Sequence, residues 1–181
     1  VLRIDTQMIE TILAHNPSVP KDQAHQRARD ALGQVGIPSP NERLKAYPHQ
    51  FSGGMRQRAM IALALACSPK LLLADEPTTA LDATVQIQIL LLLRQLQREL
   101  GMSIIFVTHD VGVATEIADE LAVMYAGKIV EIGDVADVIK KPAHPYTQGL
   151  LSSTVNSESK GKRLEVIGGS PPDMSKLFKG C

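Results

Sequence analysis

The 181-residue sequence lacks several features that would place it in a large class of proteins. It has only two cysteines, Cys67 and Cys181, which cannot build a disulfide framework and favour free thiols in a reducing compartment. Its 19 basic residues balance 19 acidic ones, so no overall positive field attracts nucleic acid or anionic lipid. No apolar run approaches the roughly 20 residues that span a bilayer. We therefore expect a soluble or membrane-peripheral protein with no nucleic-acid partner.

A phosphate-binding loop of the form G-x-x-x-x-G-K-S/T is also missing. The two Gly-Lys pairs, Gly127-Lys128 and Gly161-Lys162, lack both the earlier glycine and the following Ser or Thr. The chain begins at Val1 with neither an initiator methionine nor a signal pattern, which suits an internal cut better than a secreted start. These absences, together with the motifs below, predict that the sequence is a fragment.

Hydrophobic patterns predict that the chain begins with helices. The 44% apolar content can bury a domain-sized core, and the length suggests one compact domain plus a tail. Apolar residues at helical spacing predict helices from Arg3 to His15 and from Pro20 to Gly36, so residues 1–50 form a small helical region. Ser52 can cap a third helix, which runs to Ser68-Pro69.

The sequence of the middle of the chain predicts a parallel sheet and a connecting helix, as in an α/β fold. Leu71–Ala74 and Ser103–Thr108 are apolar segments typical of strands buried on both faces. Between them, apolar residues every three or four positions from Val85 to Leu100 predict an amphipathic helix, which Gly101 ends. The order strand, helix, strand favours a right-handed parallel crossover.

The residue pattern in the last third of the chain predicts a hairpin and short helices. Two strands, over 121–125 and 128–132, would extend the parallel sheet. We expect short helices over 113–118, 133–141 and 146–151, a polar linker over 152–163, and one strand over 164–167.

Ser52-Gly53-Gly54, at a helix start, can bind an anion. The segment offers a hydroxyl, backbone N–H groups that a ligand can approach closely, and the positive end of a helix dipole. A terminal phosphate suits such a site. Taken alone, however, Ser-Gly-Gly is more often a capped flexible loop.

Acidic residues and a histidine follow the two predicted parallel strands, where open α/β sheets bind their ligands. Asp75 can hold Mg²⁺ through water, while Glu76 orients or deprotonates an attacking water. The alternative for this pair is a solvated turn. His109 can donate to a γ-phosphate and link the attacking water to the base, although a lone histidine there is usually a surface residue. Asp82 has the alternative of an ordinary helix cap.

The order of these motifs is far more specific than any one of them. A Ser-Gly-Gly helix start, a strand with Asp-Glu-Pro-Thr, then Ala-Leu-Asp and a strand with Thr-His-Asp resemble the ATPase subunit of ATP-binding cassette (ABC) transporters. By that resemblance Asp75 and Glu76 match the Walker B pair that binds metal, Asp82 the D-loop aspartate and His109 the switch histidine. The nucleotide-binding signature is matched by Ser52, Gly53, Gly54 and Met55.

The resemblance covers most of residues 40–155 and narrows to one branch. At position 55 many relatives have Gln, whereas the Met found here resembles the sequences of the peptide and nickel importers. The segments Val123–Lys128 and His144–Thr147 resemble the same importers. It implies a P-loop NTPase-like α/β fold, of which the chain holds the C-terminal part of the parallel-sheet core. The implied segments are a helical subdomain part (1–50), the signature, Walker B and histidine half of the core (51–151), and a linker with the start of a C-terminal extension (152–181). In relatives this extension carries clustered cysteines, and an iron-sulfur role for it is left open.

Membership of this family implies ATP and Mg²⁺ as cofactors, with Glu76 and His109 catalytic in the intact protein and the fragment alone inactive. Two ATPase subunits, identical or different, sandwich ATP, with the signature of one closing over the phosphate loop of the other. The pair docks on two membrane-spanning permease subunits at the cytoplasmic face of the cell membrane and indirectly serves a solute-binding protein. We therefore expect the energising subunit of an importer for peptides or a similar small solute.

Two other functions stay open. One is a soluble cassette ATPase of DNA repair or translation, although the sequence shows neither paired CxxC motifs nor the heptads of the usual insertions. The other is a non-catalytic partner that contributes only its signature. Because the missing phosphate-loop strand belongs in the same sheet, we expect the segment to expose an apolar face, to fold poorly alone and to bind hydrophobic dyes.

Overall fold

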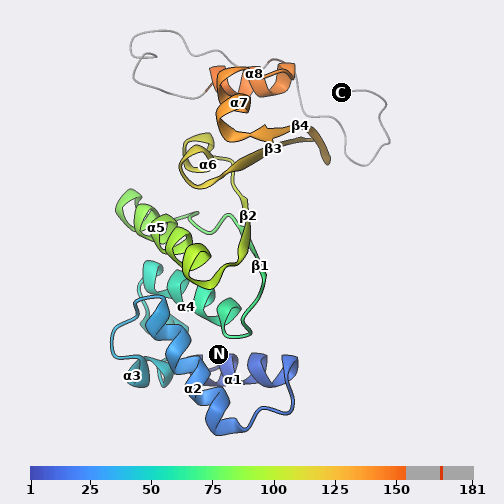
Figure 1. The fold of residues 1–181 in the computed structure, drawn as a ribbon. Helices are drawn as coiled ribbons and strands as arrows, with labels where there is room; N and C mark the ends of the chain where they lie inside the picture. The colour runs from blue at the N-terminus through green and yellow to red at the C-terminus, as the bar shows by residue number, and fades with distance from the viewer. Residues whose placement is uncertain (154–167, 169–181) are drawn as a thin grey trace. The chain divides into compact units, whose positions relative to one another are not determined.

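The computed structural model of the protein describes residues 1–153 and Gly168. The chain divides into two compact units, Val1–Val107 and Thr108–Cys181, rather than forming the single domain that its length suggests (Figure 1). The expected segment limits, after residues 50 and 151, stay a prediction. The expected strand at 164–167, Cys181 and the part of the linker beyond Ser153 lie outside the described residues.

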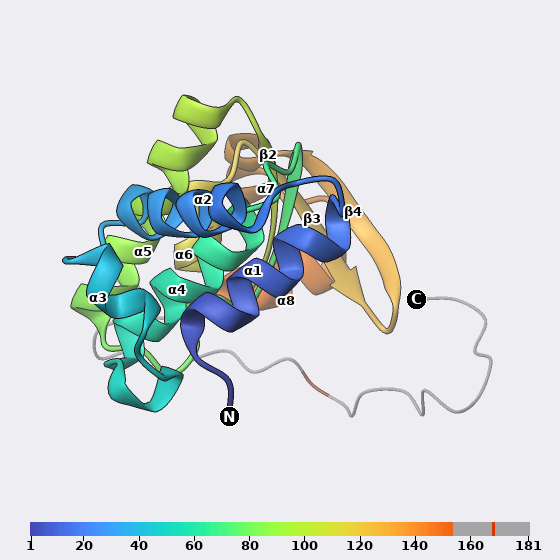
Figure 2. The ribbon, with the colours of Figure 1, turned by 90° about the horizontal axis from the view of Figure 1, so that it is seen from below.

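The first unit begins with helices, as predicted. They are α1 (Ile4–His15), α2 (Lys21–Gln34), α3 (Pro40–Leu44) and the short 3-10 helix η1 (Pro48–Gln50). Helices α1 and α2 lie side by side (Figure 2), and their apolar faces meet in a core that includes Met8, Ile12, Ala28 and Leu32. The sequence did not predict α3, which Pro40 starts in its first turn.

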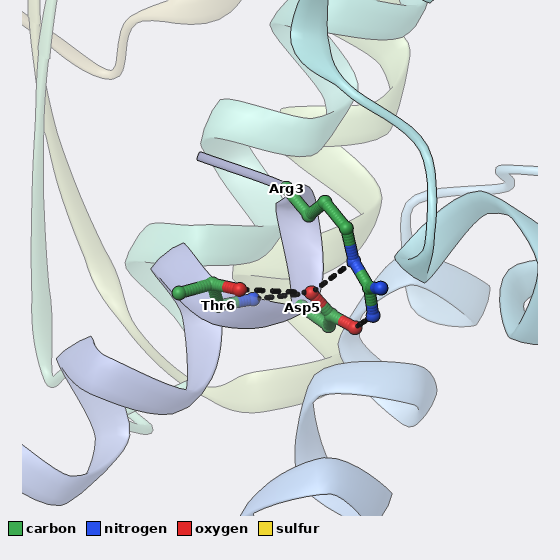
Figure 3. A network of polar contacts seen from close by, with 3 residues as sticks. All are labelled: Arg3, Asp5 and Thr6. Atoms are coloured by element: carbon green, nitrogen blue, oxygen red, sulfur yellow. Dashed lines mark hydrogen bonds and ion pairs between the residues drawn. The ribbon is translucent and has the colours of Figure 1, made fainter. Parts of the chain in front are cut away.

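A polar network fixes the start of α1 (Figure 3). The Arg3 guanidinium donates two hydrogen bonds to the Asp5 carboxylate, which also accepts the Thr6 N–H at 2.6 Å and the Thr6 hydroxyl at 3.1 Å. The hydrogen bond from Arg3 holds the pKa of Asp5 below its usual value, although burial of the side chain opposes this. The Ile4 N–H donates to the Ala46 carbonyl at 3.0 Å, so the start of α1 is also tied to the residues after α3.

Helix α4 (Gly53–Leu65) packs on this helical layer through a contact with α2. Its buried residues are Ala59, Ile61, Ala62 and Leu65. The Arg58 guanidinium donates to the Val35 carbonyl at 2.6 Å, where the carboxyl end of α2 favours a cation. These contacts hold the helix that carries the candidate anion site at its first turn.

A parallel strand pair follows, joined by the predicted long helix. Strand β1 (Leu71–Asp75) pairs in parallel with β2 (Ser103–Val107), and Asp75 lies opposite Val107 (Figure 1). Helix α5 (Ala83–Leu100) connects them and ends at Gly101, whose φ of 62° is the left-handed conformation that favours glycine. The strand, helix and strand order is therefore confirmed.

The prediction that both strands are buried on both faces is wrong. Leu72 and Ala74 are buried, but the side chains that alternate with them are exposed. The exposed fractions are 52% for Leu71, 66% for Leu73, 50% for Ile105 and 44% for Val107. No other part of the first unit covers this face, so the pair presents an apolar surface of the kind expected for a sheet without all its strands.

In the described part of the second unit, residues 108–153 and 168, the chain forms a hairpin and three short helices. Its elements are α6 (Val111–Ile117), β3 (Glu120–Tyr125), β4 (Lys128–Asp134), α7 (Val135–Lys140) and α8 (Pro145–Ser152). Strands β3 and β4 are antiparallel and form a sheet of their own, so the prediction that they extend the parallel sheet is wrong. Helix α6, which the Asp110 carboxylate caps, lies between β2 and β3 in the sequence, so β3 does not continue directly from the parallel pair. Within residues 1–153 and 168, no helix is both long and apolar enough to cross a bilayer.

Glu131 on β4 holds the start of α8. Its carboxylate accepts the Ala143 N–H at 2.8 Å and the His144 N–H at 3.0 Å. The hydrogen bond from the Ala143 N–H is the largest cause of the lowered pKa of Glu131. The nearby Thr147 hydroxyl lowers this pKa further, although the hydroxyl is buried and does not meet the geometry of a regular hydrogen bond. The ring centroids of Tyr125 on β3 and Tyr146 on α8 lie 4.5 Å apart. The His-Pro-Tyr-Thr segment therefore joins α8 to the hairpin.

We predict that this junction weakens in acid. Because the pKa of Glu131 in the folded protein lies below its usual 4.5, its stabilising effect is complete above that pH and is lost as the pH falls through the lowered value. Glu131→Gln should therefore lower the melting temperature at pH 7, and the difference from wild type should shrink below pH 4.5. Circular dichroism melts across pH measure this, with Glu120→Gln on the exposed side of β3 as control. A constant difference at all pH values would contradict the assignment.

We also predict that the uncovered face of β1 and β2 binds a hydrophobic dye. Leu73→Thr with Ile105→Thr should reduce the fluorescence of bound anilinonaphthalene sulfonate, because threonine keeps strand propensity while removing apolar surface. The control is Ile87→Thr on α5, whose side chain is 57% exposed outside the sheet. Equal losses of fluorescence in the two proteins would show that the dye does not bind this face.

Candidate active site

The start of α4 has the geometry predicted for an anion site. Ser52 is its N-cap residue, and the Ser52 hydroxyl accepts the Met55 N–H at 3.3 Å. Ser52 and Gly53 are exposed, whereas Gly54 and Met55 are half-buried. An α-helix leaves its first N–H groups without partners inside the helix, and its dipole is positive at this end. The helix start can therefore receive a phosphate from solvent.

The loop after β1 orients Glu76. The Glu76 N–H donates to the Val107 carbonyl at 2.9 Å, which continues the pairing of β1 with β2 by one residue. The Thr79 hydroxyl donates to Glu76 Oε2 at 2.7 Å, and the Thr79 N–H donates to the Glu76 carbonyl at 3.1 Å. The φ of Glu76 is 44°, an uncommon backbone conformation for a residue other than glycine and one often found at functional sites.

Thr79 is a candidate site residue that the sequence did not indicate. Its hydroxyl restrains the carboxylate assigned as the base, which matters because a base must be held within reach of the proton that it accepts. The sequence shows only a threonine three residues after a glutamate, in a turn. That spacing is too common to have identified Thr79 without coordinates.

Asp82 is a helix cap, as its alternative interpretation predicted. It is the N-cap residue of α5, and its carboxylate accepts the Val85 N–H at 3.0 Å. The Leu81 N–H donates to the Thr78 carbonyl at 3.3 Å, so the loop between Glu76 and Asp82 is held by its own hydrogen bonds. Asp82 is also exposed, and the cap leaves it accessible from solvent.

The starts of α4 and α5 lie against each other. A Cβ atom at Gly54 would lie 2.7 Å from Val85 Cγ1, and one at Gly53 would lie 3.6 Å from Leu81 Cδ2. The structure therefore brings the candidate anion site together with the residues on either side of Asp82. Sequence reasoning did not predict this contact, because the two helix starts are far apart along the chain.

The remaining predicted residue, His109, belongs to the second unit. It is exposed and follows the end of β2 by two residues, as predicted. Its neighbours form a local turn, because the Asp110 N–H donates to the Thr108 hydroxyl at 3.0 Å. The participation of His109 in one site with Glu76 stays a prediction.

The acidic pair suits a magnesium ion that is shared with phosphates. Asp75 is exposed at the end of β1, next to Glu76, and both side chains offer the hard oxygen ligands that Mg²⁺ prefers. The described part of the chain contains no group of three or more His, Cys, Asp or Glu side chains able to enclose a metal. Mg²⁺ commonly takes one or two carboxylates and completes its shell with water and substrate phosphates, which fits Asp75 in this position.

Comparison with known families identifies two parts of the chain. Residues 2–79 match the ABC transporter family, and residues 130–181 match the C-terminal region of oligopeptide/dipeptide transporters. The chain carries an ABC transporter domain. The first match contains Ser52–Met55, Asp75 and Glu76, and the second contains the Glu131 junction.

Two curated relatives come from Bacillus subtilis. The dipeptide transport ATP-binding protein DppD is 51% identical over 180 residues, covering 99% of this chain and 53% of DppD. The oligopeptide transport ATP-binding protein OppD is also 51% identical, covering 99% of this chain and 50% of OppD. The chain thus spans about half the length of the curated relatives that it matches.

A solved structure confirms the fold. The bacterial ABC transporter cassette MJ0796, determined as a dimer, superimposes with a TM-score of 0.62 at 29% identity, over 75% of this chain and 57% of MJ0796. The α/β fold of this chain is therefore that of part of an ABC ATPase cassette.

We predict that the capping role and the charge of Asp82 can be separated by substitution. Asp82→Ala should lower the free energy of unfolding by about 1 kcal/mol, because the α5 cap is lost. Asp82→Asn should stay within a few tenths of wild type, because asparagine caps equally well. Urea unfolding of the complete gene product measures both. Equal destabilisation by the two variants would show that the carboxylate stabilises the fold by its charge and not as a cap.

Proposed function

We propose that this chain forms part of an ATP-hydrolysing subunit that energises the uptake of peptides or a similar small solute. The observation that carries the proposal is the position of Asp75 and Glu76 at the carboxyl end of a parallel strand, with Glu76 restrained by Thr79. Open α/β sheets bind their ligands at this edge. The family membership supports ATP as that ligand.

The site residues divide the work of phosphoryl transfer. Glu76 accepts a proton from the attacking water or orients it, and Thr79 holds the carboxylate in place. Mg²⁺ bound with Asp75 would neutralise the phosphate charge. His109 donates a hydrogen bond to the terminal phosphate. The shared requirement is a fixed arrangement of charge around the phosphates, since phosphoryl transfer depends mainly on positioning and electrostatics.

The start of α4 acts on a nucleotide that a second subunit holds. Ser52, Gly53, Gly54 and Met55 form a helix N-terminus that a phosphate can approach from solvent. A second ABC ATPase subunit, identical or different, supplies the phosphate-binding loop that holds this nucleotide, and Asp82 lies beside the joint phosphate site. MJ0796 supports this arrangement, because it was determined as a dimer and in a post-hydrolysis state bound to ADP and Pi.

The C-terminal match favours import over the soluble alternatives. Residues 130–181 match the C-terminal region of oligopeptide/dipeptide transporters, and DppD and OppD are named for dipeptide and oligopeptide transport. We therefore assign two membrane-spanning permease subunits as partners, with a solute-binding protein acting through them. The subunit is peripheral and lies on the cytoplasmic face of the cell membrane. A soluble ATPase of DNA repair or translation has no comparable support.

We predict that Glu76→Gln abolishes turnover without loss of nucleotide binding. The amide keeps the shape of the side chain and can still accept the Thr79 hydroxyl, but it cannot accept a proton. Turnover of the complete gene product, assembled with its partners, should fall by at least about 100-fold, the usual contribution of a general base. Phosphate release measures turnover, and size-exclusion chromatography with ATP should show the nucleotide-bound dimer retained.

The control is Glu99→Gln, a change of the same chemistry on α5 far along the helix from the loop. Wild-type turnover in Glu76→Gln at matched Mg²⁺ would remove the role assigned to Glu76. Turnover that is absent from the wild-type subunit but present in its partner subunit would instead favour the non-catalytic role, in which the chain contributes only its signature.

A further inference from the structure

The start of α4 approaches α5 so closely that position 54 has no room for a side chain. A Cβ atom there would lie 2.7 Å from Val85 Cγ1, 3.7 Å from Cγ2 and 3.9 Å from Cβ. Carbon atoms in contact normally stay at least about 3.5 Å apart. An alanine at position 54 would therefore have to move either α4 or Val85.

Val85 cannot give way easily. Valine branches at Cβ, so in a helix it has one strongly preferred rotamer and cannot swing its methyl group aside at low cost. Its N–H donates to the Asp82 carboxylate at 3.0 Å, so the backbone of Val85 is held by the helix cap. A movement of Val85 would therefore disturb the cap of α5.

The cap is in turn connected to the catalytic loop. Leu81, which precedes Asp82, donates its N–H to the Thr78 carbonyl. Thr79, which follows Thr78, donates its hydroxyl to the Glu76 carboxylate at 2.7 Å. A displacement that begins at Gly54 therefore reaches the Glu76 carboxylate through contacts within a single short loop. Gly53 has no comparable restriction, because a Cβ there would lie at the ordinary contact distance of 3.6 Å from Leu81.

We propose that Val85 is a positioning residue that sets the place of the α4 start relative to the loop over residues 76–82. In this view the requirement for glycine at position 54 comes from the Val85 side chain. The nucleotide-binding end of α4 and the carboxylate that activates water then keep a fixed spacing within one subunit. The inference rests on the proposed ATP-hydrolysing function and adds a residue that neither contacts phosphate nor carries charge.

A set of substitutions in the complete gene product, assembled with its partners, tests this. Gly54→Ala should lower turnover at least about tenfold, because overpacking forces side chains and backbone to shift. Adding Val85→Ala to Gly54→Ala should restore turnover at least about fivefold, because the obstructing methyl groups are gone. Adding Val85→Thr instead should restore nothing, since threonine keeps the branched shape. Phosphate release measures turnover, and circular dichroism melts show whether each protein folds.

Gly53→Ala provides a second comparison, because Val85→Ala should not change its effect. If Gly54→Ala does not fold, recovery of folding by Val85→Ala and not by Val85→Thr supports the same contact. The proposal is overturned if Gly54→Ala is fully active. It is also overturned if Val85→Ala and Val85→Thr, each combined with Gly54→Ala, give the same turnover and the same folding. If the wild-type assembly releases no phosphate, the proposed function itself fails, and this result is separate from any comparison of the variants.

Discussion

The parallel pairing of β1 with β2 is the constraint on which the rest of the candidate site depends. It places Asp75 opposite Val107, and the Glu76 N–H extends the ladder by bonding to the Val107 carbonyl. Two acidic side chains thereby reach the carboxyl end of a strand, where a ligand can approach them. The backbone then turns sharply at Glu76, so its side chain is fixed both by the ladder and by the Thr79 hydroxyl.

Two helix starts complete this part of the molecule, and each has a distinct requirement. In the proposed function the start of α4 leaves N–H groups open to an anion, which its serine cap and two glycines allow. The start of α5 must hold the loop that carries Glu76, which the Asp82 cap does. Their close contact at Gly54 and Val85 means that neither requirement is met independently of the other.

Much of the local structure could be predicted, because short segments encode it. Ser52 and Asp82 are caps as expected, Gly101 ends α5, and the helices and strands lie close to the predicted ranges. The burial of β1 and β2 could not be predicted in the same way. A run such as Leu71–Ala74 is apolar on both faces, and whether both are covered depends on elements elsewhere in the assembly. The hairpin was likewise misplaced, because strand periodicity does not specify the partner of a strand.

The sequence by itself therefore determined the order of elements, the caps and the chemical types at the site, since each depends on residues a few positions apart. Tertiary structure alone decided that Glu131 holds the start of α8 and that Val85 excludes a side chain at Gly54. Those contacts depend on distances of a few ångströms between segments that only folding brings together. Close packing makes such distances decisive, because a single methyl group cannot be accommodated without moving its neighbours.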